Sequence, residues 1–345
     1  MNTSNSVLLS VRNVRTWFPV KKGVFKRIVG YVKAVDGVSF DLQRGETLGL
    51  VGESGCGKST LGKTILRLVP ARTGEIMYHK TDGSAANIRG LSSAEMATYR
   101  KKMQIVFQDP YSSLNPALSV FSSLRDPLIK YGIKKTSEQR QIIGDLMKAV
   151  NLRPEYMDRY PNEFSGGQRQ RIGIARALSV NPEMIICDEA VSALDVSIRA
   201  QVLNLLLELK DERNLTYIFI THDLSVVEYI SDRIAVMYLG KIVELAPTKS
   251  LYVHQFHPYT QALLSAIPVV DVKSQRKRIV LEGDVPSPVN PPSGCAFHPR
   301  CRFCTEICKH ETPQLKGYEV DGQIHYVACH LMDSMQQVKK NEVEK

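Results

Sequence analysis

Nine consecutive residues have the composition and order of a phosphate-binding loop. They are Gly52, Glu53, Ser54, Gly55, Cys56, Gly57, Lys58, Ser59 and Thr60, in the pattern G-x-x-x-x-G-K-S. The glycines let the backbone curl so that successive N–H groups point at phosphate oxygens, and a following helix adds partial positive charge there. Lys58 then contacts the β- and γ-phosphates, and the hydroxyl of Ser59 reaches Mg²⁺. The loop predicts a site for a nucleoside triphosphate such as ATP.

Polar side chains suited to metal and water chemistry follow short apolar runs elsewhere in the chain. They are Gln108, Asp188, Glu189 and His222. We expect Asp188 to hold Mg²⁺ beside Ser59, and Glu189 to polarise the attacking water. The amide of Gln108 can contact the metal ion or that water, and His222 can reach the γ-phosphate. A histidine in such a place is by itself more often structural, so this role for His222 depends on the phosphate loop.

Two further sequences predict contacts with a nucleotide. Phe164 is followed by Ser165, Gly166, Gly167 and Gln168, and residues 169–180 then have helical spacing. Ser165 can cap that helix, and the glycines expose backbone N–H groups at its start, which makes a second anion-binding helix end. Upstream of the phosphate loop, Tyr31 can stack on adenine, and Trp17 and Phe18 compete for that role.

Apolar patterns predict the elements that position these side chains. Residues 47–51 form a continuous apolar run typical of a buried strand, and residues 58–68 repeat leucine and isoleucine at helical spacing. Residues 23–30 are basic and predict a loop. Other strands are expected at 7–19, 34–42, 74–78, 103–107, 184–187, 216–220, 233–238 and 241–245. Helices are expected at 120–150, with breaks near Pro127 and Gly132, at 169–180, and after 192–195.

The composition is that of a water-exposed globular chain. Of 345 residues, 43% are hydrophobic, and no apolar run approaches the roughly 20 residues that span a bilayer. No secretory signal is evident, so we expect a cytosolic chain whose role in any transport needs membrane partners on other chains. The net charge of +10 is compatible with nucleic acid, an anionic membrane or a solvated surface. Because the cations are scattered, a solvated surface is favoured.

Five of the seven cysteines crowd the C-terminal end, at positions 295, 301, 304, 308 and 329. In a cytosolic chain this clustering indicates a metal rather than disulfides. A structural zinc ion and a 4Fe–4S cluster each take four ligands, and reduced cysteines without metal are the third alternative. The composition changes at 257–260, and a proline-rich stretch follows. We therefore expect an ATPase domain over residues 1–250 and a small cysteine-rich domain over 251–345.

The order of these motifs resembles that of ATP-binding cassette (ABC) ATPases over residues 7–250. The resemblance implies a P-loop NTPase of the α/β class, with a RecA-like core, an antiparallel β-subdomain and an α-helical signature subdomain at about 110–180. It implies ATP contacts from residues 52–60 and from Tyr31, Gln108, Ser165 to Gln168, Asp188, Asp195 and His222, and catalytic roles for Glu189, His222 and Gln108. Mg²⁺ is expected at Ser59, Gln108 and Asp188. In such proteins two cassettes enclose two ATP molecules, each between one chain's phosphate loop and the other's signature helix. The resemblance places Ser165 to Gln168 in the signature motif, which here begins with Phe164 where leucine is usual.

The flanks narrow the resemblance to the ATPase subunits of bacterial oligopeptide and dipeptide importers. The runs WFPVKKG, QDPYSSLNP, HPYTQALLSAIP and GCAFHPRC carry it, and the N-terminus is most similar to the second, F-type ATPase of the pair. Nickel or other small solutes are alternative cargo, because binding specificity lies in other chains.

The resemblance implies a non-identical ATPase subunit, two permease subunits and a substrate-binding protein, with this chain at the cytoplasmic face of the inner membrane. It also implies a 4Fe–4S site at Cys295, Cys301, Cys308 and Cys329, with Cys304 as an alternative ligand and zinc as an alternative metal.

Two other protein classes share the cassette chemistry. One of them comprises DNA-repair and chromosome ATPases. Those of the chromosome type separate the phosphate loop from the strand that carries the acidic residues by a long coiled coil, but no sustained heptads lie between Gly52 and Asp188. Translation-factor cassette proteins carry two cassettes, whereas this chain has one set of motifs. We therefore expect an ATP-hydrolysing importer subunit that does not act on nucleic acid.

Overall fold

The chain divides by its internal contacts into two compact units, each made of segments that are separated in the sequence. The computed structural model describes residues 6–109, 114–267 and 278–332. The first unit contains the described residues of 1–8, 42–47 and 78–221, and the second contains those of 9–41, 48–77 and 222–345. Residues 110–113, within the predicted QDPYSSLNP motif, lie outside the described residues.

Three parallel strands form the centre of the first unit. They are β6 (Met103–Val106), β7 (Met184–Asp188) and β8 (Thr216–Ile220), paired in that order. Every residue of β7 and β8 is buried, which explains their continuous apolar runs, because parallel strands are covered on both faces. The helix α7 (Val196–Arg213) buries Val202, Leu205, Leu206 and Leu209 on the face that their spacing predicts.

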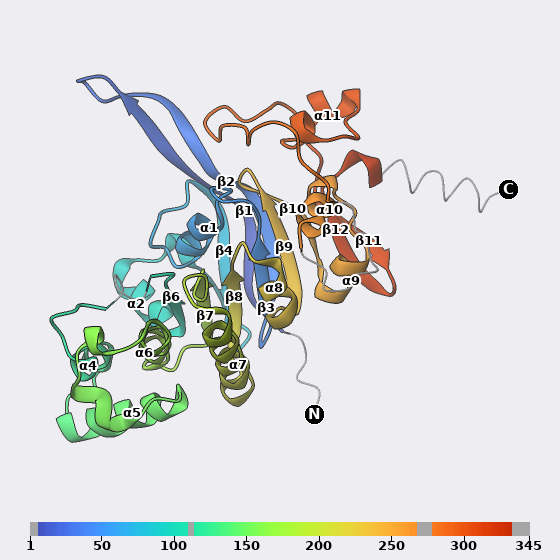
Figure 1. Ribbon diagram of the computed structural model, residues 1–345. Helices are drawn as coiled ribbons and strands as arrows, with labels where there is room; N and C mark the ends of the chain where they lie inside the picture. The colour runs from blue at the N-terminus through green and yellow to red at the C-terminus, as the bar shows by residue number, and fades with distance from the viewer. Residues whose placement is uncertain (1–5, 110–113, 268–277, 333–345) are drawn as a thin grey trace. The chain divides into compact units, whose positions relative to one another are not determined.

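Helices make up most of the rest of the first unit. The helices α4 (Val120–Lys130), α5 (Thr136–Ala149) and α6 (Gly166–Leu178) pack on one another (Figure 1). The 3-10 helix η2 (Pro154–Asp158) packs on α4 and α5, and η3 (Pro161–Glu163) precedes α6. The predicted break near Gly132 is confirmed, but the break near Pro127 is wrong, because Pro127 lies inside α4. Proline removes one backbone hydrogen bond there, and burial of Val120, Leu124 and Leu128 along one face offsets that loss. The helix α2 (Ser93–Lys102) follows β5 (Ala85–Asn87) and η1 (Ile88–Gly90).

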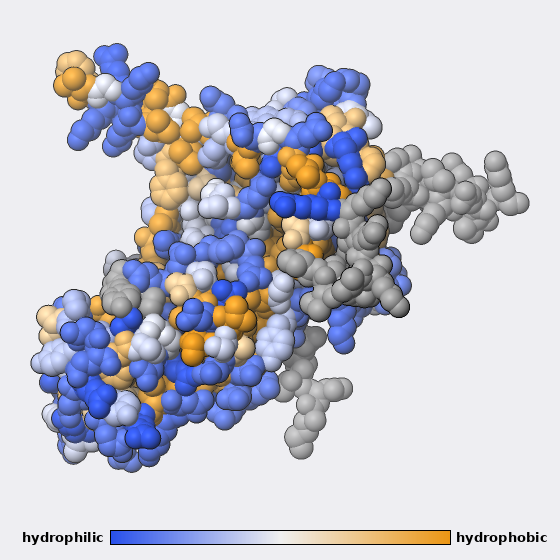
Figure 2. Space-filling model, in the orientation of Figure 1, coloured by the Kyte–Doolittle hydropathy of each residue, from blue (hydrophilic) through white to orange (hydrophobic). Residues whose placement is uncertain are grey.

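A long two-stranded ribbon belongs mostly to the second unit. The strands β1 (Val7–Lys22) and β2 (Arg27–Gln43) pair along it, and β4 (Thr73–His79) pairs with β1. The loop predicted at 23–30 is therefore wrong beyond residue 26, because the β-branched Ile28 and Val29 favour extended backbone. At the tip, Val24 and Phe25 are 95% and 86% exposed among basic side chains, and Figure 2 shows this mixture of hydrophobic and hydrophilic colour.

A mixed sheet follows in the second unit, in the order β11-β12-β10-β9-β3. The strand β3 (Thr47–Val51) runs parallel to β9 (Arg233–Tyr238), while β10 (Lys241–Pro247), β12 (Gln323–Val327) and β11 (Lys316–Val320) continue the sheet in antiparallel pairs. The helices of this unit are α1 (Lys58–Ile65), α8 (Leu224–Ile230), α9 (Thr248–Val253), α10 (Pro258–Ser265), η4 (His298–Arg300) and α11 (Glu306–His310). Ala296 and Phe297 join one hydrophobic cluster with residues of β9 and α10. The C-terminal segment, by which we mean the described residues after 250, therefore packs on the core of this unit.

A buried polar network holds the start of α10. Both carboxylate oxygens of Glu244 accept backbone N–H groups, from Phe256 at 2.9 Å and from His257 at 3.1 Å. The Nε2 atom of His325 lies 2.8 Å from Oε1 of the same carboxylate. His257 caps the helix, since its Nδ1 accepts the N–H of Tyr259 at 3.1 Å. This acceptor role requires the neutral imidazole.

The neutral state of His257 predicts a stability that depends on pH. Burial lowers the pKa of His257 from 6.5 to about 4, so the unfolded chain binds a proton that the folded protein rejects. This contribution to stability is complete above pH 6.5 and is lost as the pH falls towards 4, by up to about 3 kcal/mol. Urea unfolding across this range measures it. His257→Asn keeps a capping acceptor that does not titrate, so its stability should decline less; an equal decline in both proteins would contradict the assignment.

Candidate nucleotide-binding site

The phosphate loop connects β3 to α1 in the second unit, as its sequence predicts, and its glycines have backbone angles that other residues rarely adopt. The φ angles of Gly52, Gly55 and Gly57 are +149°, +79° and +105°. A Cβ atom on Gly52 would lie 2.2 Å from the carbonyl oxygen of Met237, and one on Gly57 would lie 1.9 Å from that of Ala34. Gly57 also occupies the N-cap of α1. The loop is therefore packed so closely that only glycine fits at these two positions.

Lys58 is folded back over this loop. Its Nζ donates hydrogen bonds to the carbonyl oxygens of Gly52, at 2.8 Å, and Glu53, at 3.0 Å. The side chain is buried, so its charge is concentrated at the loop, where phosphate oxygens of a ligand can replace the two carbonyls. Cys56 is also buried, and burial raises the pKa of its thiol, which favours the unreactive neutral form.

Two of the three aromatic candidates for adenine stacking lie together in the second unit. The ring centroids of Trp17 and Tyr31 are 6.2 Å apart, and the guanidinium of Arg72 lies 4.7 Å from the first and 4.6 Å from the second. Phe18 is 39% exposed. The arrangement leaves Tyr31 and Trp17 as alternatives, and the contact with adenine stays a prediction.

The predicted catalytic residues Glu189 and Gln108 lie beside each other in the first unit. Because β6 and β7 are parallel with Val106 opposite Cys187, their continuations bring Gln108 and Glu189 to the same level. The Nε2 of Gln108 donates to Oε2 of Glu189 at 2.9 Å and to Oγ of Ser192 at 3.4 Å. Glu189 has φ +51° and its N–H donates to Ile220 at 2.9 Å, so the turn after the strand is fixed by the neighbouring strand. The structure thus brings Gln108 and Glu189 together with Ser192, the first residue of the run 192–195 that precedes α7.

The remaining acidic and histidine candidates lie at or after the carboxyl ends of β7 and β8. Asp188 ends β7 and is buried, and His222 follows β8 by two residues in the sequence and belongs to the second unit. Asp195 is the N-cap residue of α7, without a side-chain capping bond.

The signature sequence caps α6 as expected. Oγ of Ser165 accepts the N–H of Gln168 at 3.3 Å, and Oε1 of Gln168 accepts the N–H of Ser165 at 2.9 Å, which is a capping box. A Cβ atom on Gly167 would lie 2.3 Å from Cγ2 of Ile198, so this glycine permits close packing of α6 on α7. The buried Arg169 donates to the carbonyls of Pro161 and Phe164, which fixes the preceding loop.

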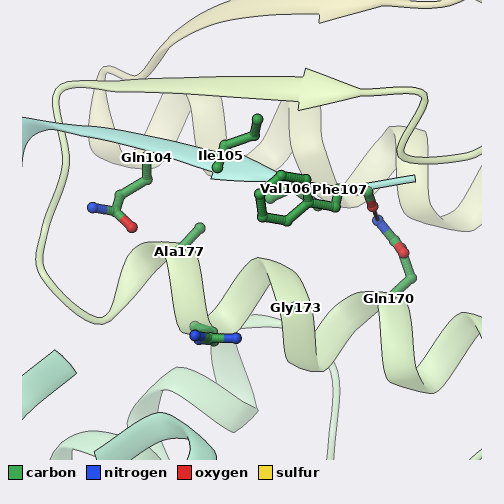
Figure 3. Close-up of a pocket in the computed structure, with 8 residues that line it drawn as sticks. Gln104, Ile105, Val106, Phe107, Gln170, Gly173 and Ala177 are labelled. Carbon is green, nitrogen blue, oxygen red and sulfur yellow. Dashed lines mark hydrogen bonds between the residues drawn. The ribbon is translucent and has the colours of Figure 1, made fainter. Parts of the chain in front are cut away.

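A small hollow lies between β6 and α6, also in the first unit. It measures about 160 Å³ and is lined by Gln104, Ile105, Val106, Phe107, Gln170, Gly173, Arg176 and Ala177 (Figure 3). The Nε2 of Gln170 donates to the carbonyl of Phe107 at 3.5 Å across it. The small side chains of Gly173 and Ala177 account for the space, and none of the predicted nucleotide contacts lines it.

Two residues that contact the phosphate loop were missed by sequence reasoning. The hydroxyl of Tyr259 accepts the N–H of Glu53 at 2.8 Å, across a separation of 206 residues. Arg300 pairs with the Glu53 carboxylate at 2.9 Å and 3.2 Å, across 247 residues. Tyr259 stands in the run HPYTQALLSAIP and Arg300 in GCAFHPRC, but nothing in their spacing indicates a contact with the loop.

The C-terminal cysteines lie near one another in the second unit. The N–H of Cys295 donates to the carbonyl of Cys308 at 2.8 Å. Burial is the main cause that raises the pKa of Cys329 to about 12, and negative charge on Cys295, Cys301 or Cys308 raises it as well. Among the described residues, no group of three or more His, Cys, Asp or Glu side chains is placed so that it could hold a metal ion. The predicted 4Fe–4S or zinc site is therefore not confirmed.

Within the described ranges, every helix lacks the length or the apolar character needed to cross a bilayer.

Comparisons with known proteins agree on one kind of protein. The sequence pattern of the ABC transporter family matches residues 35–192, and that of the oligopeptide/dipeptide transporter C-terminal region matches residues 243–308. The oligopeptide transport ATP-binding protein AppF of Bacillus subtilis (strain 168) is 52% identical over 331 residues, which cover 95% of this chain and 98% of AppF. The dipeptide transport ATP-binding protein DppF of Haemophilus influenzae is 49% identical over 329 residues, covering 95% and 98%.

Solved structures give the same result for the fold. The dimeric ATP-binding cassette MJ0796, in a post-hydrolysis state bound to ADP and Pi, is 28% identical with a TM-score of 0.60, and the match covers 70% of this chain and 99% of that one. The predicted cassette-type nucleotide-binding fold is confirmed. A separate cysteine-rich C-terminal domain is not.

The crowding at Gly57 predicts a sharp difference between two glycine substitutions. Gly57→Ala and Gly55→Ala both place alanine at positive φ, which costs roughly 1–2 kcal/mol each. Only at Gly57 does the new Cβ meet a backbone oxygen; at Gly55 nothing lies within 4 Å. Gly57→Ala should therefore lose its binding of Mg²⁺–ATP and should be less stable to heat than Gly55→Ala. Gly55→Ala should keep an affinity for Mg²⁺–ATP within a few-fold of that of the wild type. Calorimetric titration and thermal unfolding compare them, and equal losses would contradict the packing argument.

Proposed function

Because the chain belongs to the ABC transporter family, among the oligopeptide and dipeptide transport ATP-binding proteins, we propose that its ATP hydrolysis drives peptide import across a bacterial inner membrane. The chain is an ATPase of this family. The observation that supports peptide as cargo is the match of the C-terminal region, together with about 50% identity to peptide transport proteins over most of the chain.

In this proposal the second unit binds the triphosphate. The N–H groups of the phosphate loop and the ammonium of Lys58 hold the β- and γ-phosphates, and an aromatic ring, Tyr31 in the first place, stacks on adenine. Ser59, Asp188 and Gln108 offer hydroxyl, carboxylate and amide oxygens, the hard donors that Mg²⁺ takes. The ion supplies neutralisation of charge on the phosphates.

Glu189 is the proposed general base for the attacking water. Its hydrogen bond from Gln108 orients the carboxylate and leaves the amide oxygen of Gln108 to accept from water or face the metal ion. His222 is proposed to contact the γ-phosphate. The capped start of α6, with Ser165 to Gln168, and Asp195 at the start of α7 are proposed to complete the site of a second cassette, because the N–H groups at a helix start attract phosphate.

The same reasoning gives the partners. We propose that the chain works with a non-identical ATPase subunit and two permease subunits, at the cytoplasmic face of the membrane, and that a substrate-binding protein delivers the peptide to the permease. The run from Asp109 to Pro116 is the proposed contact with a permease loop. The homologous peptide transport proteins support this assembly over a DNA-repair ATPase.

The role of Glu189 predicts a variant that binds but does not turn over. In the assembled complex, Glu189→Gln should lower the ATPase rate at least 100-fold, since general bases contribute about 10²–10⁴-fold, and should still bind ATP. Lys58→Ala should weaken nucleotide binding itself. Glu183→Gln is a matched control at the opposite end of β7, where the carboxylate pairs with Arg44 and Lys102 at 2.7 Å each. It should keep its turnover, and near-normal turnover in Glu189→Gln would refute the assignment.

We further propose that residues 251–345 act as a C-terminal domain in which Cys295, Cys301, Cys308 and Cys329 hold a structural 4Fe–4S cluster. The support is the mutual proximity of these thiols and the proline-rich, weakly apolar character of the segment, which favours a crosslink. Their placement in the structure does not itself form a metal site, so binding requires the thiols to converge. Cys304 is the alternative ligand.

Anaerobic purification followed by iron, sulfide and zinc analysis tests this centre. About four irons per chain with visible absorption, both lost on Cys301→Ser, is the expected result. Cys187→Ser is the control, because Cys187 is buried in the first unit and should leave the metal content unchanged. One zinc ion per chain, without visible absorption, would show that the cysteines bind metal but that the metal is not iron. The absence of any metal, together with unchanged stability of Cys301→Ser, would refute both the cluster and the metal site.

A further inference from the structure

Glu53 places a negative charge in the loop that is proposed to bind phosphate. An unpaired carboxylate in the same loop as Lys58 would repel an incoming triphosphate and compete with it for the ammonium. In the structure this carboxylate is turned to Arg300, with Nη1 to Oε2 at 2.9 Å and Nη2 to Oε1 at 3.2 Å. Such a two-point pair fixes both the charge and the orientation of the acid. The negative charge of the loop is therefore neutralised by a residue of the C-terminal segment.

The backbone of Glu53 is held as well. Its N–H donates to the hydroxyl of Tyr259 at 2.8 Å, and its carbonyl accepts from Nζ of Lys58 at 3.0 Å. Burial raises the pKa of Tyr259, so this hydroxyl stays protonated throughout the physiological range. All three polar groups of Glu53 thus have partners, two of them from the C-terminal segment.

The groups that hold Glu53 are themselves rigidly placed. The side chain of Arg300 is only 7% exposed, and its guanidinium lies 6.0 Å from the ring of Tyr238. The ring of Tyr259 lies 4.7 Å from that of Tyr238 and 5.5 Å from that of Phe297, between centroids. Tyr259 also stands in the first turn of α10, which the buried Glu244 network anchors. These contacts make the C-terminal segment a firm support for a glycine-rich loop.

We propose that Arg300 and Tyr259 are positioning residues for the phosphate loop, through which the C-terminal segment sets the affinity for ATP. Arg300 withdraws the Glu53 charge from the phosphates, and Tyr259 holds the backbone so that the loop needs little reordering on binding. The proposal rests on the proposed function of the loop as the ATP site. Neither residue touches the reacting atoms, so the turnover number should change little.

A charge-removal rescue tests this proposal. Arg300→Met keeps the length and the apolar packing of the side chain but leaves the Glu53 carboxylate without its charged partner. In the assembled complex, the KM for Mg²⁺–ATP should therefore rise about tenfold, while kcat stays within twofold of the wild-type value. Glu53→Gln removes the repulsion, and the double variant Arg300→Met/Glu53→Gln should return KM to within about threefold of the wild type. Tyr259→Phe should raise KM by a few-fold. Binding of Mg²⁺–ADP by titration gives a second readout without turnover.

Arg302→Met is the matched control from the same segment. Arg302 donates to Gln261 at 3.3 Å and, within the described part of the chain, makes no hydrogen bond or ion pair with the loop. The KM of Arg302→Met should therefore equal that of the wild type. An unchanged KM in Arg300→Met, or a rise that Glu53→Gln does not relieve and that parallels a loss of thermal stability, would overturn the proposal and leave Arg300 with a purely structural role. A wild-type complex that neither binds nor hydrolyses ATP would instead overturn the proposed function.

Discussion

The conformation of the phosphate loop is the constraint on which the second unit is built. Gly52 and Gly57 lie against the carbonyl oxygens of Met237 in β9 and Ala34 in β2. A Cβ atom added to each glycine would lie only 2.2 Å and 1.9 Å, respectively, from these oxygens. The N–H of Gly240 donates to the carbonyl of Cys56 at 2.9 Å, which ties the loop to the turn after β9. Strands distant in sequence therefore shape a backbone whose glycines have little preference of their own. The C-terminal segment adds to this support at Glu53.

The first unit depends on a different device, the register of parallel strands. Because β6, β7 and β8 are aligned, the residues after them reach one edge of the sheet, where Gln108 and Glu189 meet. Polar side chains can stand at this edge because the chain leaves the buried core there. The positive φ of Glu189 is a local strain of the kind found at functional sites, and the hydrogen bond to Ile220 holds it. If Glu189 is the proposed base, this support means that it needs little rearrangement before it acts.

Sequence alone predicts the parts of this structure whose pattern is local. Continuous apolar runs give β7 and β8, Ser165 with Gln168 gives the cap of α6, and the loop glycines give the turn between β3 and α1. Local patterns fail where long-range packing decides, as at Pro127, whose helix is held by its buried face. They fail likewise for the β11–β12 hairpin, which pairs with β10, and for Arg300, whose partner is 247 residues away. The arrangement of the C-terminal cysteines is not fixed by their spacing either.

Transport by the assembled complex in sealed vesicles decides whether ATP hydrolysis by this chain drives peptide import. The vesicles carry permease, both ATPase subunits and the substrate-binding protein, with Mg²⁺–ATP on the side of the ATPases and a labelled peptide on the other. If hydrolysis drives import, peptide should accelerate ATP hydrolysis and accumulate on the ATP side against its gradient. ATP hydrolysis that is indifferent to peptide, with no accumulation of the label, would contradict it.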